Sequence, residues 1–137
     1  MTRSPAHAAT DTDRPGALRA LRALRVASTA AVVIIVLQGV TAGEILSRSR
    51  VAETLHFGGA FVVHLCTGLT ALAAFLLARR RRVSWWPTGI AVAVFVVSFA
   101  QAAFGEFGVL SVHVPLAMLL LVGSVVVMAW SYARPRV

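Results

Sequence analysis

Four long apolar stretches, each of about twenty residues, constrain this chain more than any other feature of its sequence. An α-helix rises about 1.5 Å per residue, so roughly twenty residues cross the hydrocarbon core of a bilayer. We place the stretches at residues 26–46, 55–78, 88–107 and 110–130. With 58% hydrophobic and 13% charged residues, a 137-residue chain has too little interior to hide its apolar surface from water. The pattern therefore predicts a membrane protein.

The stretches divide the chain into three parts. Residues 1–25 are polar and contain proline and arginine, so we expect a disordered tail with a helical tendency in the repeat at 18–25. Residues 26–132 form the predicted four-helix transmembrane domain, and residues 133–137 form a short C-terminal tail. We expect the first span to remain in the protein, because its apolar run is longer than the core of a cleaved signal.

The arginines predict how the chain crosses the membrane. All 13 basic residues are arginine: five precede the first span, four lie at 79–82 and two follow the last span. Only Arg48 and Arg50 flank the opposite side. Because cytoplasmic flanks carry the excess of arginine, we expect both termini and the 79–82 loop in the cytoplasm. Trp85, Trp86 and Trp130 fall at this same interface, where indole rings are enriched.

Short connections between the spans favour one architecture. The fold class that we predict is an all-α membrane protein, an antiparallel four-transmembrane-helix bundle with cytoplasmic N- and C-termini. Gly39 and Gly43 form a GxxxG pair, which we interpret as a helix-packing surface. We interpret the small residues of the second span in the same way: Gly58, Gly59, Ala60 and Gly68.

The same composition predicts partners and location. The net charge of +8 comes from arginines beside apolar runs rather than from a basic stripe with interleaved aromatics. The lipid bilayer and its anionic headgroups are therefore the expected partners, and nucleic acid is not. The arginine-, alanine- and valine-rich composition is compatible with a GC-rich bacterial genome, so we expect a multi-pass protein of the bacterial cell membrane.

A few polar side chains interrupt the apolar background. An unpaired polar group in hydrocarbon costs several kcal/mol, so such residues are candidates for function. They are Gln38, Thr41, Glu44, Glu53, His56, His64, Gln101, Glu106 and His113.

His56 and His113 are predicted to lie at similar depth. Each is about one turn into a helix that starts at the non-cytoplasmic surface. Two imidazoles that face each other across a bundle can supply both axial ligands of a heme iron. The alternative is a pair of interfacial histidines in contact with headgroups and water.

Two neighbours of His56 allow several interpretations. His64 lies eight residues further, about 12 Å deeper, and cannot share the iron of His56. It could bond to Gln38 or Gln101, help to hold a second group, or be a packing residue. Glu53 shares a helix face with His56 and could orient its imidazole or take part in proton chemistry; the alternative is a solvated acid at a helix start.

A weak internal repeat links the two halves. Gln38 with Gly43 and Glu44 recurs, one residue out of register, as Gln101 with Gly105 and Glu106. Each set is followed by a helix that has histidine near its start. Two helical hairpins related by an axis along the membrane normal would place His56 and His113 symmetrically about that axis.

The segment Glu53-Thr54-Leu55-His56, the Gln-x-x-x-Gly turn at 101–105, and Val112-His113 followed by Leu116-Ala117 resemble one four-helix half of heme A synthase over about residues 26–132. The resemblance implies that the paired histidines of the second and fourth helices, here His56 and His113, ligate heme. It also implies that the acidic residue three positions before the first histidine, here Glu53, serves the oxidation chemistry.

The chain departs from that family at three points. Phe57 stands where an arginine typically follows the first histidine, and the loop between the first two spans is short and has no cysteine pair. Family members commonly have eight helices, so a chain with one half would work as a homodimer, within a larger membrane complex, or in a different way.

The sequence thus predicts an integral membrane protein that binds heme b and serves electron transfer or heme modification. Glu53 is the catalytic candidate, His56 and His113 are the iron ligands, and Gln38, Gln101 and His64 complete the cofactor-binding candidates. The main alternative is a non-enzymatic membrane assembly factor or accessory subunit without heme. A small transporter or proton-relay subunit that uses the glutamates with His56 is a third hypothesis.

Overall fold

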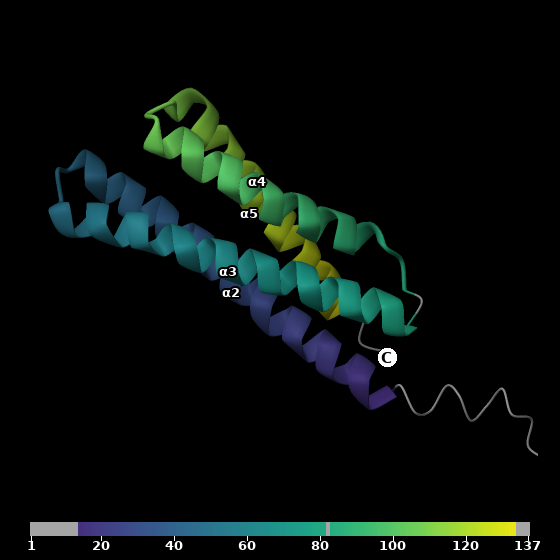
Figure 1. Ribbon diagram of the computed structural model, residues 1–137. Coiled ribbons are helices and arrows are strands. Elements are labelled where there is room, and N and C mark those ends of the chain that lie inside the picture. Colours follow the sequence, from purple (N-terminus) through teal and green to yellow (C-terminus); the bar gives the residue numbers. More distant parts are fainter. Residues whose placement is uncertain (1–13, 82, 134–137) are drawn as a thin grey trace, which may run out of the picture.

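The computed structural model describes residues 14–81 and 83–133, and all the regular structure in these residues is helical. Figure 1 shows the helices α2 (Arg14–Leu46), α3 (Arg50–Arg81), α4 (Trp86–Glu106) and α5 (Leu110–Ala133). All four are long and apolar enough to cross a membrane. The prediction of an all-helical chain with four candidate membrane spans is therefore confirmed.

Helix α2 begins well before the first apolar stretch. Ala17, Leu21 and Leu24 recur every three or four residues and are buried, which is the pattern of a helix with one covered face. Residues 14–25 are thus helical, although only 18–25 had a predicted helical tendency. Residues 1–13 and 134–137, where the rest of the two predicted tails fall, lie outside the described residues.

The helices pack in a closed ring around one axis. Helix α3 contacts α2 and α4, and α5 contacts α4 and α2, so α3 and α5 stand diagonally across the bundle. The turns at 47–49 and 107–109 lie together at one end of the molecule, which we call the turn end (Figure 1). The α3–α4 connection lies at the other end, which we call the arginine end because it includes Arg14–Arg25 and Arg79–Arg80.

The two turns at the turn end have the same backbone geometry. Ser49 N–H donates to Glu44 O (3.4 Å) and Arg48 N–H to Ile45 O (2.8 Å), which are the two bonds of a Schellman motif. Val109 N–H and Gly108 N–H form the equivalent bonds after α4, at 2.8 and 3.0 Å. Both turns place one residue in the left-handed region: Arg48 with φ of 61° and Gly108 with φ of 70°.

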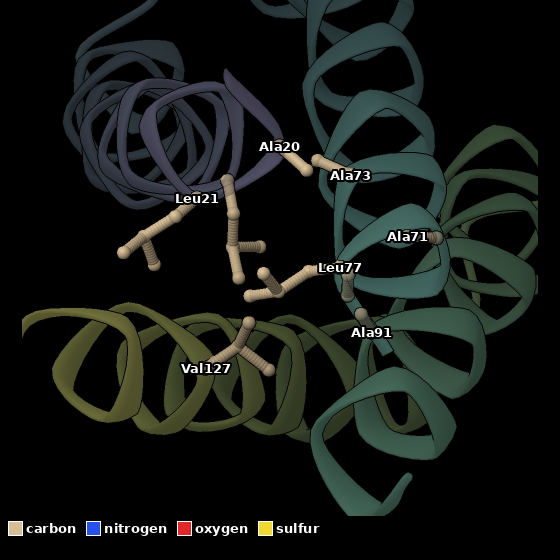
Figure 2. Close-up of a cluster of buried hydrophobic side chains, with 9 residues drawn as sticks. Ala20, Leu21, Ala71, Ala73, Leu77, Ala91 and Val127 are labelled. Carbon is tan, nitrogen blue, oxygen red and sulfur yellow. The ribbon is translucent and has the colours of Figure 1, made fainter. Parts of the chain in front are cut away.

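The buried core lies towards the arginine end. Figure 2 shows a cluster to which all four helices contribute, including Leu21, Leu77, Ala91 and Val127. Of the described residues, the buried ones lie within 17–35, 63–78, 87–98 and 120–131, with Ala52 as the exception. The half of the bundle near the turn end, in contrast, has almost no fully buried side chain.

The predicted small-residue packing surfaces are only partly right. A Cβ added at Gly59 would collide with the Gln38 side chain, and one at Gly68 would lie 3.0 Å from the Phe95 ring, so these two glycines do allow close packing. A Cβ at Gly39, Gly43 or Gly58 would have no described atom within 4 Å. The GxxxG pair therefore does not pack helices within this chain, because it faces away from the neighbouring helices.

Candidate functional site

His56 and His113 meet across the bundle near the turn end. Their ring centroids lie 6.3 Å apart, with the planes at 57°. His56 stands eleven residues before the buried Thr67 on α3, and His113 stands eleven before the buried Ser124 on α5. Because eleven residues make about three helical turns, both histidines project from the core-facing line of their helix. The structure thus brings the predicted pair together.

The His56 ring is held through its Nδ1 atom. Nδ1 lies 3.1 Å from the backbone oxygen of Gln38 and 3.0 Å from Thr41 Oγ1. The Thr41 hydroxyl donates to the same Gln38 oxygen at 3.0 Å. Since a carbonyl oxygen only accepts, Nδ1 carries the proton and donates to it. This tautomer leaves Nε2 of His56 unprotonated and able to bind a metal.

The His113 ring is held in the same way by helix α4. Nδ1 donates to the backbone oxygen of Gln101 at 2.8 Å, so Nε2 again keeps its lone pair. The Gln101 amide nitrogen lies 3.1 Å from both ring nitrogens. A position equidistant from the two lies well off the lone-pair axis of either. The amide is therefore an off-axis donor to Nε2, and a metal ion bound at Nε2 would displace it.

The weak sequence repeat corresponds to a repeated contact. In each hairpin, a glutamine backbone oxygen of the first helix holds the Nδ1 atom of a histidine on the second: Gln38 with His56, and Gln101 with His113. The glycines of the repeat do not correspond. A Cβ at Gly105 would lie 2.6 Å from the His113 ring, whereas one at Gly43 would meet nothing within 4 Å.

These features fit a bis-histidine heme. A metal ion bound end-on between two imidazoles, at about 2 Å from each nitrogen, sets the ring centroids about 6 Å apart. Metal-binding histidines usually donate their other N–H to a carboxylate or a backbone carbonyl, as both rings do here. Few side chains are fully buried in the half of the bundle around them, where a macrocycle would need room. The described chain contains no group of three or more His, Cys, Asp or Glu that could hold a metal, but a heme iron needs only two protein ligands.

His64 has its own partners near the middle of the bundle. The Ser98 hydroxyl donates to Phe95 O at 2.7 Å and therefore accepts from Nδ1 of His64, at 2.8 Å. The His64 ring also stacks on Phe99, with centroids 4.1 Å apart and planes at 6°. Of the interpretations left open, this geometry supports a satisfied packing residue. Its hydrogen-bond partner is Ser98 rather than Gln38 or Gln101.

Glu53 lies in the first turn of α3 and its side chain is exposed. It does not orient the imidazole of His56, because Gln38 O and Thr41 hold the ring. Glu44 and Glu106 are also exposed, at or near the ends of α2 and α4. The role of Glu53 in proton or oxidation chemistry remains a prediction.

The sequence reasoning missed Ser98. Its partner His64 is 34 positions away, and their contact depends on the relative rotation of α3 and α4. One sequence signal could have pointed to Ser98. It lies three residues before Gln101, so the two polar side chains project from the same side of the helix.

Comparisons with known proteins add no relative to this description: no family model matches the chain, and no curated protein or solved structure does.

Proposed function

We propose that this chain is an integral membrane protein that binds one b-type heme through His56 and His113, as a one-half relative of heme A synthase. One observation carries the proposal. Two imidazoles from diagonal helices lie with centroids 6.3 Å apart, and each has its Nδ1 atom on a glutamine backbone oxygen. Bound heme would supply one-electron redox chemistry for electron transfer or heme modification.

The proposal includes an orientation. The helices would form an antiparallel bundle in the bacterial cell membrane, with both termini in the cytoplasm and the histidine pair near the opposite face. The arginine distribution supports this orientation, as do contacts at the arginine end. There, the Arg25 guanidinium lies 5.2 Å from the centroid of the Tyr132 ring, and Trp86 packs against Trp130 with centroids 6.1 Å apart. Arginine is typical of a cytoplasmic flank, and tryptophan and tyrosine rings are typical of a membrane interface on either side.

The residues around the pair have distinct tasks in this proposal. The Gln38 and Gln101 carbonyls fix the tautomer in which Nε2 is the free nitrogen, and Thr41 adds a second acceptor for His56. Gly105 leaves space for the His113 ring. Glu53 is the acid nearest in sequence to the pair and is open to water, where it can exchange protons.

An absorption spectrum tests the proposal. Protein expressed with added heme and purified in mild detergent should show a Soret band and sharp reduced α and β bands. His56→Ala and His113→Ala should each remove the low-spin bands. His64→Asn is the matched control and should keep them, because His64 is bonded to Ser98 and stacked on Phe99.

Two results would contradict the proposal. A folded wild-type protein without any chromophore after heme-supplemented expression would favour an assembly factor or accessory subunit. Low-spin bands that survive both His56→Ala and His113→Ala would place the heme ligands elsewhere.

A further inference from the structure

The two histidines of the pair differ in one contact, although their hairpins repeat the same backbone bond. The Gln38 side-chain amide lies against Gly59 on α3, where an added Cβ would collide with the amide nitrogen. Among the described residues, no hydrogen bond joins that amide to the His56 ring. The Gln101 amide nitrogen, in contrast, lies 3.1 Å from Nε2 of His113. The repeat is therefore unequal at the nitrogen that would bind iron.

This amide contact makes Nε2 of His113 the less available of the two nitrogens. Nε2 is unprotonated and can only accept, because Nδ1 donates to the Gln101 backbone oxygen at 2.8 Å. The lone pair that accepts the amide N–H is the one that iron would need. The bond is off the lone-pair axis and so weaker than a linear one, but it must still break. Within the described chain, His56 has no such bond to lose.

A second difference concerns how firmly each ring is positioned. Nδ1 of His56 has two acceptors, Gln38 O at 3.1 Å and Thr41 Oγ1 at 3.0 Å. In the other hairpin, the residue three positions after the glutamine is Phe104, which has no hydroxyl group. Among the described residues, Nδ1 of His113 thus has the Gln101 backbone oxygen as its single acceptor. Supporting bonds of this kind raise the affinity of a metal-binding histidine.

We infer that His56 is the tight ligand of the heme and His113 the exchangeable one, with the Gln101 amide as the group that competes for its Nε2. The inference rests on the proposed heme and specifies how the two ligands differ. A small neutral ligand of the iron, such as carbon monoxide, would replace His113 rather than His56. The hydrogen-bond donors beside an axial position help to decide which ligands a heme iron accepts there, and Gln101 is such a donor.

Heme titration of single-histidine variants tests the inference. Wild-type protein in mild detergent first establishes the low-spin spectrum. His113→Ala, which keeps His56, should bind heme at least about tenfold more tightly than His56→Ala, which keeps His113. Adding Gln101→Leu to His56→Ala should recover several-fold of this affinity, because the competing amide is gone while the backbone oxygen remains. Gln38→Leu in the His113→Ala background is the matched control and should leave heme affinity unchanged.

Carbon monoxide gives a second measurement that a purely structural role of Gln101 would not move in the same direction. Reduced, heme-loaded wild-type protein should bind carbon monoxide. Gln101→Leu should need several-fold more of it for half-saturation, because His113 then holds the iron more tightly. Gln38→Leu should match the wild type.

Three results would overturn the inference. In a protein whose wild type shows low-spin bands, equal heme affinities of His56→Ala and His113→Ala, or a tighter His56→Ala, would do so and leave the heme proposal standing. If either histidine variant does not fold, half-saturation of Gln101→Leu at the wild-type concentration of carbon monoxide overturns it. A folded wild type without a chromophore would contradict the heme proposal itself, and the inference with it.

Discussion

The histidine pair shows how a polar ring can be accommodated at little cost in an apolar bundle. Each imidazole has one nitrogen that donates and one that accepts, and the backbone oxygens of Gln38 and Gln101 take up the donor. Backbone oxygens within a helix normally accept from the fourth residue ahead but keep a second lone pair for such bonds. One nitrogen of each ring is therefore fixed by the main chain and does not depend on a second side chain.

Gly105 offers a direct test of how His113 is positioned. In Gly105→Ala the new methyl group would collide with the ring, which must move off the Gln101 oxygen. We expect heme affinity to fall by at least about tenfold, the loss typical when a supporting contact of a metal ligand is removed. The measurement is a heme titration followed at the Soret band.

Gly43→Ala is the matched control, because it makes the same substitution near the end of the other hairpin's first helix, at a position with open space around it. Its affinity should equal that of the wild type. Equal losses in the two variants would mean that glycine acts through general helix packing and not through the His113 ring.

The turn residues Arg48 and Gly108 allow a second prediction. An L-residue in the left-handed region costs roughly 1 kcal/mol, so Arg48→Gly should raise the free energy of unfolding by about that amount. Gly108→Ala should lower it by about 1 kcal/mol for the same reason. The measurement is helix loss by circular dichroism as sodium dodecyl sulfate is added to mixed micelles. Shifts of the same sign in both variants would refute this account.

Among individual residues, the sequence was informative where helix geometry alone decides. His56 and His113 lie at equal depth on helices that run in the same direction, and they meet across the bundle. The equal depth and the contact were both predicted from the sequence. The partner of His64 and the position of the Gln101 amide depend on how helices rotate against each other. Hydropathy reports only that a residue tolerates an apolar environment, so it could not have identified either.

At the scale of elements, the four spans were predictable but their ends were not. An apolar run marks the part of a helix that lipid surrounds. The helix itself can extend further where packing against neighbouring helices buries one of its faces. Helix α2 continues beyond its apolar run at the arginine end, where its Leu21 and Leu24 share a buried cluster with Leu77 of α3. Arginine in this part of α2 does not interrupt the helix, because Arg19 and Arg22 lie on its exposed face.

Leu77 tests whether this cluster stabilises the bundle. Leu77 is 2% exposed, and Leu77→Ala should cost about 2–4 kcal/mol in the free energy of unfolding through lost contacts and the cavity left behind. Leu72→Ala, on the same helix at 53% exposure, should cost less than about 1 kcal/mol. Reversible unfolding in mixed micelles measures both. Similar losses in the two variants would show that the cluster is no more important than the outer face of α3.

At the scale of the whole molecule, the orientation can be tested with two engineered cysteines. In a Cys66→Ser background, Ser47→Cys and Ser84→Cys place one thiol at the turn end and one at the arginine end. A membrane-impermeant maleimide added to intact cells should label the first at least about tenfold more than the second, because Arg-rich flanks stay in the cytoplasm. Preferential labelling at Ser84→Cys would invert the proposed topology.

The uneven burial along the bundle has a consequence for assembly. The cluster of Leu21, Leu77, Ala91 and Val127 involves no ligand, so the arginine end can form as soon as the four helices meet in the membrane. The half near the turn end has almost no fully buried side chain, so a planar ligand that entered there would disturb little of the packed core. If the chain binds heme as proposed, the arginine end would already be folded before the ligand reaches the turn end.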